Sequence, residues 1–336
     1  MAELAAVAYH LPERVVTNDD LAGAHPEWRM AEVQAKTGIV QRHVAAPDET
    51  SGDLAVAAAR ELFATSACRP ESIDFILLCT QTPDYLLPTT ACVLQQTLGI
   101  PTAAGALDFN LGCSGYVYGL SLAKGLIESG QARSVLLLTA ETYTKLIHPD
   151  DRAARVLFGD GASATWVKDG GDKSHIGPFV FGTDGAGARH LLVPAGGMRE
   201  PRTADTSRAE ADSKGNVRSR ENLFMNGAEV FAFTLRVVPN TVARLLDAAH
   251  LHLDDVDYFV FHQANAQMIE HLRQRIGVRQ EKVVLAMRRY GNTVSSTIPI
   301  ALRDASLAGA FQSGARIMLV GFGVGFSWGA TLIRWP

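Results

Sequence analysis

The chain has 336 residues, of which 47% are hydrophobic and 20% are charged, and its net charge is −4. This size and composition predict one large or two ordinary folded domains with a substantial core. The small net charge gives no electrostatic basis for binding nucleic acid or an anionic membrane, and no apolar run is long enough to span a bilayer.

The first ten residues are expected to form a strand rather than a signal peptide, because no basic region precedes their short apolar stretch and Pro12 soon follows. The four cysteines include no C-x-x-C pair, so neither a disulfide framework nor a zinc site is predicted. Three of them, Cys68, Cys79 and Cys92, lie among apolar residues and are expected to pack in the core. We therefore expect a cytoplasmic protein that holds no metal.

Short apolar runs rich in Val, Ile and Leu alternate with helical patterns along the chain. The clearest runs are residues 75–79, 134–139, 258–261 and 317–320. Apolar strands of this kind are buried on both faces, which predicts an α/β fold built of layers.

These runs form two similar pairs. Residues 74–79 read Asp-Phe-Ile-Leu-Leu-Cys and residues 257–262 read Asp-Tyr-Phe-Val-Phe-His, while residues 133–138 resemble residues 316–320 at the same offset. Chance is the alternative explanation, because apolar strands led by Asp are common in α/β proteins. We interpret the pairs as an internal duplication, with an N-terminal half over residues 1–173 and a C-terminal half over residues 174–336.

The duplication places three candidate catalytic residues, Cys113, His262 and Asn292. Cys113 and Asn292 occupy matching positions in the two halves, each where a strand ends and a helix is expected to begin. His262 ends the apolar strand that opens the second half. Groups at strand ends and helix starts converge on crevices in layered α/β folds, so we expect these three side chains in one cleft.

A Cys/His/Asn set is typical of acyl transfer through an acyl-enzyme. Glycines on both sides of Cys113 indicate a tight turn, and a following helix start is expected to lower the pKa of its thiol. The plain alternatives are a small buried cysteine and a buried histidine with satisfied hydrogen bonds. The alternating glycines of residues 321–329 fit either backbone donors for an oxyanion or a structural turn.

With these pieces in view, the chain resembles the β-ketoacyl-(acyl carrier protein) synthase III family of the thiolase superfamily. The resemblance covers nearly the whole length, and its motifs occur in order. They are Lys-Thr-Gly-Ile at 36–39 with Arg-His at 42–43, Asp-Phe-Asn-Leu-Gly-Cys-Ser-Gly at 108–115, Leu-Phe-Gly-Asp-Gly-Ala at 157–162, Met-Asn-Gly-Ala-Glu-Val-Phe at 225–231, His-Gln-Ala-Asn at 262–265, Tyr-Gly-Asn-Thr at 290–293 and the final glycine loop. Each motif alone is weak, but their joint occurrence is specific.

This resemblance implies a five-layer α-β-α-β-α fold of two duplicated halves and a homodimer. It implies a reaction in which Cys113 takes an acyl group from acyl-CoA or an acyl-carrier protein. Malonyl-carrier protein then loses CO2, and its carbanion attacks the acyl-Cys to give a 3-oxoacyl thioester. Acyl carrier protein and acyl-CoA are thus the implied partners, and no cofactor is implied.

The resemblance also implies residue roles. His262 and Asn292 would donate hydrogen bonds to the malonyl thioester carbonyl, and the backbone amides of Cys113 and Val324 would hold the acyl oxyanion. Asn292 separates the chain from elongating synthases, which carry a second His there, and from hydroxymethylglutaryl synthases, which use a Glu.

Substrate contacts follow from the same resemblance. Lys36 and Arg152 are expected to contact coenzyme A or the carrier, and Leu87, Phe158 and Met225 are expected to line the acyl pocket. Leu87 stands where a bulky aromatic residue commonly reaches across the dimer to the pocket floor, so we expect tolerance of primers larger than acetyl.

Three features depart from the family pattern. Gln267 replaces the arginine five residues after the catalytic histidine, and Trp28 is too far from residues 37–38 to match the tryptophan that often stacks on adenine. Coenzyme A binding is therefore expected to be weaker, or the acyl donor to be a carrier protein. Residues 198–222 form a long polar excursion between strands to which the sequence assigns no role.

Other readings remain open at this stage. A non-condensing acyltransferase of the same fold would pass the acyl group from Cys113 to a hydroxyl or amine, but it would not need Asn292. A papain-like cysteine protease fits the order of Cys, His and Asn, but its Cys-Gly-Ser-Cys-Trp stretch and a secretory signal are absent. An inactive scaffold subunit is disfavoured because all three reactive residues are present.

Overall fold

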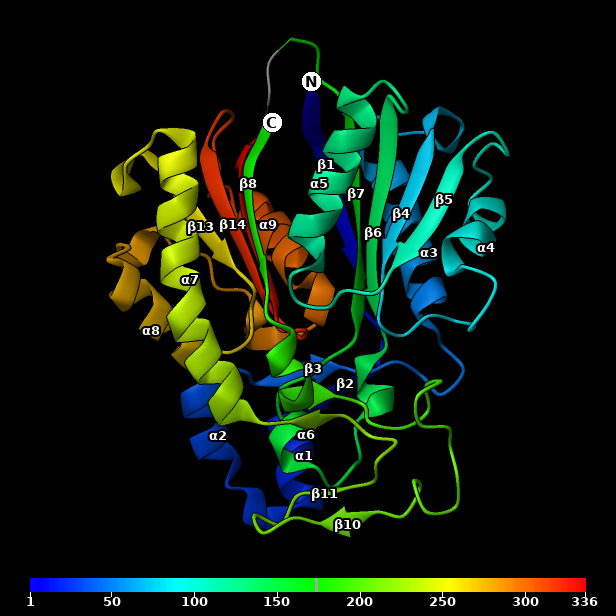
Figure 1. Ribbon diagram of the computed structural model, residues 1–336, viewed down its shortest axis with the longest axis vertical. Coiled ribbons are helices and arrows are strands. Elements are labelled where there is room, and N and C mark those ends of the chain that lie inside the picture. Colours follow the sequence, from blue (N-terminus) through cyan, green and yellow to red (C-terminus); the bar gives the residue numbers. More distant parts are fainter. Residues whose placement is uncertain (173–174) are drawn as a thin grey trace.

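The computed structural model describes residues 1–172 and 175–336, which form two sheets that face each other across a layer of helices (Figure 1). The first sheet has the order β1 (Ala2–His10), β7 (Gly161–Asp169), β6 (Ser134–Glu141), β4 (Phe75–Cys79) and β5 (Gly105–Phe109). The second has the order β8 (Ile176–Thr183), β15 (Ser327–Arg334), β14 (Arg316–Gly323) and β13 (Tyr258–Phe261).

The two sheets repeat one another. Strand β4 pairs in parallel with β6, and β6 pairs antiparallel with β7, just as β13 pairs in parallel with β14 and β14 antiparallel with β15. The match extends to single hydrogen bonds. The Asp74 carboxylate accepts from the backbone N–H of Arg133 at 2.8 Å, and the Asp257 carboxylate accepts from that of Arg316 at 2.8 Å. The predicted duplication is confirmed, whereas its proposed boundary at residues 173 and 174 lies outside the described residues.

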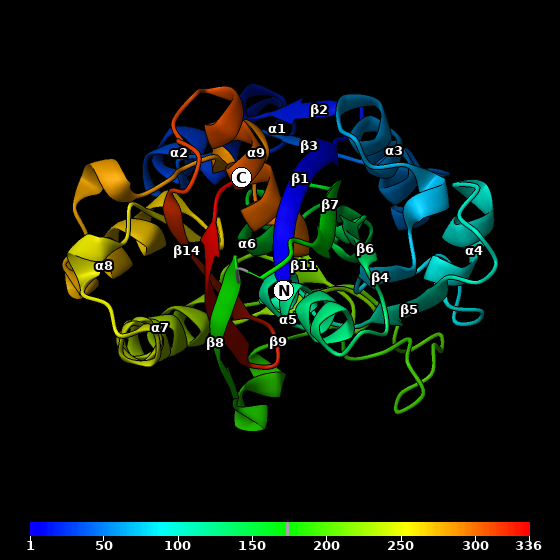
Figure 2. The same ribbon diagram turned by 90° about the horizontal axis from the view of Figure 1, so that it is seen from above.

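Helices fill three layers around these sheets (Figure 2). Between the sheets lie α5 (Gly115–Glu128) and α9 (Thr297–Leu307), whose apolar faces share one core with both sheets. The outer face of the first sheet carries α3 (Ser51–Thr65) and α4 (Thr90–Thr97). The outer face of the second carries α7 (Gly227–Ala249) and α8 (Ala266–Ile276). The predicted five-layer α/β fold is therefore confirmed.

The apolar runs read from the sequence account for this layering. All eight residues of β6 are buried, as expected for a strand covered by helices on both faces. Leu120 of α5 and Leu302 of α9 are completely buried between the sheets. Burying one such leucine side chain contributes roughly 1.5–3 kcal/mol to folding, so the helical middle layer holds the two halves together.

Smaller elements cover one end of both sheets. They are β2 (Val15–Thr17), α1 (Asn18–Ala24), α2 (Met30–Thr37), β3 (Gln41–His43), α6 (Arg152–Arg155), β9 (Leu191–Leu192), β10 (Glu210–Ala211), β11 (Val217–Arg218) and β12 (Phe224–Met225) (Figure 1). The buried Arg42 ties this region together, because its guanidinium donates to the carbonyl of Val16 at 3.1 Å and to that of Val156 at 2.9 Å. These elements close over the strand ends that carry the candidate residues.

Short 3-10 helices make the remaining connections. They span Pro26–Trp28, Pro70–Ser72, Tyr143–Leu146, Gly185–His190, Leu253–Asp255, Gln280–Lys282, Met287–Arg289 and Val294–Ser296. Within the described part of the chain, no helix has the length and apolarity to cross a bilayer. The same residues contain no cluster of three or more His, Cys, Asp or Glu side chains suited to a metal ion.

Candidate active site

The structure brings Cys113, His262 and Asn292 to one cavity of about 90 Å³. Cys113 lies just before α5, His262 follows β13 directly, and Asn292 lies shortly before α9. Phe158 and Met225, predicted for the acyl pocket, line the same cavity. The three candidate catalytic residues therefore meet where strand ends of the two halves converge.

The turn between β14 and β15 approaches the sulfur of Cys113. The backbone N–H groups of Val324 and of Cys113 itself both act on this sulfur, because each lowers the pKa of the thiol. Gly323 allows this approach, because a Cβ there would lie 2.8 Å from the Cys113 Sγ. The glycine loop thus brings the N–H of Val324 beside the nucleophile, where it joins the N–H of Cys113 as a second donor of the kind that an oxyanion requires.

The pKa of Cys113 differs from the sequence-based expectation. Burial, with a smaller contribution from the Glu141 carboxyl, raises the pKa of the thiol to about 12, although the backbone N–H groups of Val324 and Cys113 act in the opposite direction. The predicted lowering of this pKa is wrong, because desolvation outweighs the donors at the helix start. Cys113 is therefore a neutral thiol near pH 7.

His262 is buried, with only 2% of its surface exposed. Its Nδ1 lies 2.7 Å from the hydroxyl of Thr297, and its ring packs edge-on against Phe322. Burial lowers the pKa of His262 to about 3, so the imidazole is neutral near pH 7. It acts in the cavity as a hydrogen-bonding group and not as a cation.

Thr297 decides which ring nitrogen of His262 carries the proton. The single hydroxyl proton of Thr297 has two acceptors within reach, Nδ1 of His262 at 2.7 Å and the carbonyl of Val294 at 3.1 Å. When the hydroxyl donates to Nδ1, the proton of the neutral ring lies on Nε2. His262 can then offer an N–H donor to a ligand in the cavity.

The side-chain amide of Asn292 is oriented by the chain that follows it. Its Oδ1 accepts from the backbone N–H of Val294 at 2.9 Å, which leaves the NH2 group to donate elsewhere. The Asn292 backbone is fixed as well, since its N–H donates to the carbonyl of Leu157 at 2.8 Å and its carbonyl accepts from Gly159 at 3.1 Å. The cavity therefore receives a second oriented donor.

The turn after Asn292 is strained. Val294 has a φ of 54°, in the left-handed region that β-branched residues rarely adopt. Such a conformation costs on the order of 1–3 kcal/mol and persists only where its surroundings impose it. Here the hydroxyl of Ser295 donates to Glu141 at 3.2 Å, and that of Ser296 lies 2.8 Å from the Thr139 hydroxyl. Hydrogen bonds to strand β6 of the first half thus hold the Asn292 turn.

Glu141 is a site residue that the sequence did not reveal. Its completely buried carboxyl accepts from the Gln81 backbone N–H at 3.1 Å, the Thr82 hydroxyl at 3.0 Å and the Ser295 hydroxyl at 3.2 Å. Burial raises the pKa of Glu141 to about 8. The one available signal was an acidic residue that ends an otherwise uncharged strand over residues 134–141.

Other predicted contacts lie outside the cavity. Leu87 is 82% exposed on a loop that leaves β4, Lys36 is exposed at the end of α2, and Arg152 is half-buried at the start of α6. Gln267 is exposed on α8. Trp28 is buried and stacks on His25 with ring centroids 3.9 Å apart, so its ring packs within the protein. Cys92 is exposed on α4, which makes its predicted place in the core wrong.

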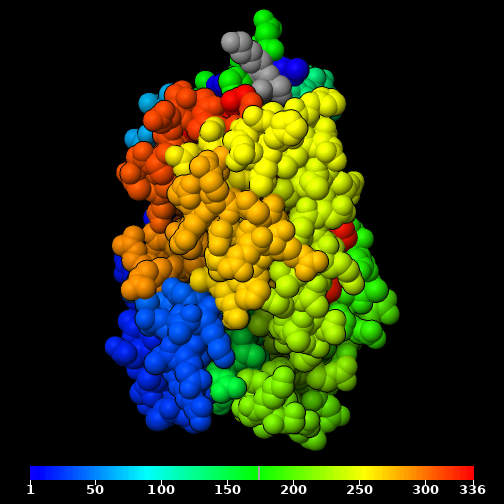
Figure 3. Space-filling model, turned by 90° about the vertical axis from the view of Figure 1, so that its left-hand side faces the viewer, coloured from blue at the N-terminus to red at the C-terminus, as the bar shows by residue number. Residues whose placement is uncertain are grey.

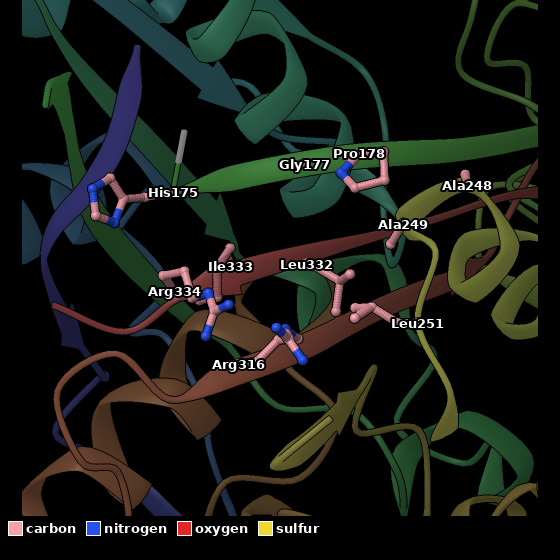
Figure 4. A pocket seen from close by; sticks show the side chains of 10 residues that line it. All are labelled: His175, Gly177, Pro178, Ala248, Ala249, Leu251, Arg316, Leu332, Ile333 and Arg334. Atoms are coloured by element: carbon pink, nitrogen blue, oxygen red, sulfur yellow. The ribbon is translucent and has the colours of Figure 1, made fainter. Parts of the chain in front are cut away.

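The structure has two further depressions, a groove beside the Leu87 loop and a cavity at the opposite end of β14 and β15. A groove of about 660 Å³ runs beside the Leu87 loop and is lined in part by Gln81, Tyr85 and Leu146. A second cavity, of about 340 Å³, is lined by the side chains shown in Figure 4, including Arg316 and Arg334. These arginines face each other at the end of β14 and β15 opposite to Val324. That cavity therefore does not belong to the Cys113 site.

The molecular surface is recessed next to the site. In Figure 3 the blue N-terminal segment, the gold residues of α8 and the yellow-green start of α7 surround a small, set-back green area with the colour of residues near 150. The start of α7 and α8 contribute Gly227, Val230 and Met268 to the lining of the Cys113 cavity. A substrate chain can approach the cavity between these elements.

Gly291 tests how tightly the Asn292 turn is held. Gly291 and Gly309 both have a φ near 70°, but an added Cβ at Gly291 would lie 2.7 Å from the Leu157 carbonyl, whereas Gly309 faces open space. We expect Gly309→Ala to cost about 1–2 kcal/mol from the backbone conformation alone, and Gly291→Ala to cost clearly more and to reduce activity. Denaturant unfolding measures both. Equal costs would contradict this account.

Glu141 predicts a dependence of stability on pH. Its pKa in the folded chain is raised from 4.5 to about 8, so its contribution to stability is complete below about pH 4.5 and is lost as the pH rises through about 8. The free energy of unfolding of the unsubstituted chain should therefore fall relative to that of Glu141→Gln between these pH values, by at most about 1.4 kcal/mol per pH unit. A difference that stays constant from pH 5 to pH 9 would refute this.

Comparison with known proteins identifies the family. The family described as 3-oxoacyl-(acyl-carrier-protein (ACP)) synthase III matches residues 107–185, and the one described as the C-terminal part of that synthase matches residues 246–335. The β-ketoacyl-(acyl-carrier-protein) synthase III of Symbiobacterium thermophilum is 38% identical over 328 residues, which cover 97% of this chain and 95% of the relative. That of Caldanaerobacter subterraneus is 36% identical over 329 residues, with the same coverage.

A solved structure agrees with these relatives. A crystal structure described as 3-oxoacyl-(acyl-carrier-protein) synthase III shares 56% identity with this chain, covers 99% of both chains and has a TM-score of 0.98. With the family matches, the relatives and the convergence of Cys113, His262 and Asn292 on one cavity, the chain belongs to the 3-oxoacyl-(acyl-carrier-protein) synthase III family of the thiolase superfamily.

Proposed function

We propose that this protein is a condensing enzyme that joins an acyl thioester to malonyl-carrier protein with loss of CO2, as expected for its family. The observation that carries this proposal is the arrangement of the cavity. One thiol lies beside the backbone donors of Cys113 and Val324, and two further neutral side-chain donors, His262 and Asn292, line the same space. A condensation needs two such donor sets, one for the acyl oxyanion and one for the malonyl enolate.

In the first step Cys113 takes up the acyl group. Its sulfur attacks the carbonyl of the acyl thioester, and the negative oxygen accepts hydrogen bonds from the N–H groups of Cys113 and Val324. The C–S bond to the donor then breaks, and the leaving thiolate takes the proton that Cys113 gives up. Because the raised pKa keeps Cys113 a neutral thiol near pH 7, its proton must be transferred during this step.

In the second step the malonyl thioester carbonyl accepts hydrogen bonds from the Nε2–H of His262 and the NH2 group of Asn292. The bond to the malonyl carboxylate breaks, CO2 departs, and the electron pair remains as an enolate held by the two donors. The enolate carbon attacks the acyl-Cys carbonyl, a carbon–carbon bond forms, and Cys113 leaves as a thiolate. This thiolate takes up one proton from solvent, which restores the thiol. Loss of CO2 supplies the carbanion, so the chemistry calls for no additional cofactor.

The acyl donor and the carrier are proposed to reach the site past α2 and α6. Lys36 and Arg152 lie at the end of α2 and the start of α6, where their positive charges would meet phosphate groups of coenzyme A or of a carrier-bound arm. The curated relatives are named for an acyl carrier protein, which supports that partner. A cytoplasmic location remains a prediction from the sequence.

We further propose a homodimer formed through the edge of the first sheet. Strand β5 is an edge strand, and its Leu107 is partly exposed, which is unfavourable for a strand that stays unpaired. The side chains of Tyr85, Leu86 and Leu87 are also exposed, on the loop that follows β4, the strand paired with β5. A second copy placed over this face would bury them and bring Leu87 toward the partner's acyl pocket, as the family resemblance implies.

The other readings receive less support. A papain-like protease does not share this family or its duplicated fold. Simple acyl transfer to a hydroxyl or amine would use Cys113 and Val324 but leave the oriented NH2 group of Asn292 without a role. Condensation uses every donor that the cavity offers.

Measuring both half-reactions tests the proposed function. The protein is incubated with a panel of acyl-CoA and acyl-carrier thioesters, the mass added at Cys113 is determined, and malonyl-carrier protein is then added while CO2 is measured. We expect an acyl adduct at Cys113 followed by release of CO2. Acylation without CO2 release would favour simple transfer, and no adduct from any donor would reject the catalytic role of Cys113.

Thr297 should affect only the decarboxylation step. In the proposed mechanism the Thr297 hydroxyl, 2.7 Å from His262 Nδ1, donates to that nitrogen. Thr297→Val removes this donor, so the Nε2–H form is no longer favoured. We expect CO2 release to fall about tenfold while acylation of Cys113 is unchanged. Thr297→Ser keeps the hydroxyl and should behave like the unsubstituted protein. An equal loss in both steps would show that Thr297 has only a structural role.

Leu87 should set the size of the primer. With leucine in place of a bulky aromatic side chain, we expect the protein to use acyl groups longer or more branched than acetyl. Leu87→Phe should narrow this range toward acetyl, while Leu86→Phe, which alters a neighbouring exposed leucine, should not. Competition between acetyl and medium-chain thioesters measures the range. Failure of the unsubstituted protein on every medium-chain donor would contradict the prediction.

A further inference from the structure

The polar excursion over residues 198–222 does more than cover the surface. It contains the two-stranded hairpin of β10 and β11, and Asn216 in the turn between these strands is buried. The hairpin reaches the start of α6 through backbone and side-chain hydrogen bonds. Val217 N–H donates to the carbonyl of Asp150 at 3.2 Å, and Asn216 Oδ1 accepts from the N–H of Ala153 at 3.2 Å.

An ion pair strengthens this contact. The Arg218 Nη1 lies 3.1 Å from Oδ2 of Asp151, and the exposed fractions of these side chains are 15% and 2%. Asp151 also accepts from the N–H of Ala153 at 3.1 Å and so forms the N-cap of α6. The other side of the guanidinium bonds to Asp212, and its plane lies over the ring of Phe224. Arg218 is therefore fixed on every side by contacts of the excursion and α6.

The buried charge of Asp151 depends on Arg218 for compensation. Asp151 is almost completely buried, and among the described residues Arg218 is its ion-pair partner. Removing one member of a buried pair leaves the other charge without compensation, so the segment that carries it must shift or bring in water. A change at Arg218 is thus expected to move Asp151 together with the start of α6.

The start of α6 is close in sequence to residues proposed to contact the substrate. Arg152 is the residue next to Asp151. The side chain of Arg152 makes no hydrogen bond or ion pair with the described residues. Three residues after α6 ends lies Phe158, which lines the Cys113 cavity, and the intervening Leu157 accepts the hydrogen bond from Asn292. Arg218 is therefore linked through Asp151 to Arg152, the residue proposed to contact the phosphate groups of the donor.

We propose that Arg218 is a positioning residue, which acts through Asp151 to hold Arg152 toward the phosphate groups of the thioester donor. This inference rests on the proposed function, in which Arg152 contacts coenzyme A. It assigns to the excursion a role in donor binding and not in the chemical step. In this proposal, residues 198–222 support the start of α6, where the donor's phosphate groups would bind.

A double-mutant cycle tests this role. Arg218→Ala, Arg152→Ala and the double variant are compared in the full-length protein by the KM and kcat for acylation from acyl-CoA. We expect Arg218→Ala to raise KM about tenfold with kcat changed less than about twofold, because only binding is affected. The double variant should be no worse than Arg152→Ala, since both act through one contact. Additive effects of the two substitutions would overturn the proposal.

Control variants separate positioning from general damage. Arg208→Ala removes an exposed arginine of the same excursion, which pairs with Asp205 at 3.5 Å, and should leave KM unchanged. Arg218→Lys retains the charge but not the forked geometry and should restore part of the affinity. If Arg218→Ala lowers the melting temperature too far for assay, Asp212→Asn, which weakens the contact of Asp212 with Arg218 together with its hydrogen bonds from Lys214 and Asn216, should raise KM in the same direction. An unchanged KM in that variant would also reject the proposal.

Binding of coenzyme A itself distinguishes this inference from the proposed function. Titration calorimetry with free coenzyme A needs neither acyl transfer nor decarboxylation. We expect the dissociation constants of the Arg218 and Arg152 variants to rise together, even if the protein released no CO2 from malonyl-carrier protein. Loss of CO2 release alone would reject the condensing function, whereas unchanged coenzyme A affinity in Arg218→Ala would reject the positioning role.

Discussion

Burial of the three reactive side chains limits what each of them can do. A buried polar atom needs a hydrogen-bond partner, and every partner that the protein supplies occupies an atom that a substrate could have used. Oδ1 of Asn292 is bound to Val294 and Nδ1 of His262 to Thr297. The groups left for a ligand are the NH2 of Asn292 and Nε2 of His262. The NH2 of Asn292 is a neutral donor, and Nε2 of His262 is one when the Thr297 hydroxyl donates to Nδ1, which suits a negative charge that appears only during the reaction.

The same burial sets the protonation states. It keeps His262 neutral and raises the pKa of Cys113, so the empty cavity holds no formal charge on either group. The oriented donors of this uncharged cavity stabilise the oxyanion or enolate at the moment when it forms. The thiol therefore becomes reactive together with the binding of the donor.

Contacts between the halves maintain this geometry. Residues of β6 in the first half, Thr139 and Glu141, hold the serines that follow Asn292 in the second half. In return, the turn between β14 and β15 of the second half brings Val324 to Cys113 of the first. The strained backbone at Val294 persists because these contacts act from both sides. The second half carries both His262 and Asn292, whereas the pair of backbone donors from Cys113 and Val324 requires both halves.

Much of this could be predicted from local sequence, and the rest could not, for definable reasons. Cys113 and His262 follow the short strands β5 and β13, so periodicity and glycine placement located them. Asn292 was expected at a strand end, but it follows the 3-10 helix Met287–Arg289. The pKa of Cys113 depends on how completely distant segments exclude water, which local sequence does not encode. Glu141 has the appearance of an ordinary strand end, and its importance arises from residues 81, 82 and 295. Arg218 and Asp151 are far apart in the chain, and only the fold pairs them.

The separation of the two donor sets is the central claim, and one single-turnover measurement on Asn292→Ala tests it most directly. The variant is mixed with an acyl donor and then with malonyl-carrier protein, while the acyl adduct at Cys113 and the CO2 released are followed in the same sample. The account predicts acylation at close to the unsubstituted rate and CO2 release slower by about 100- to 1000-fold. Equal slowing of both steps would contradict it.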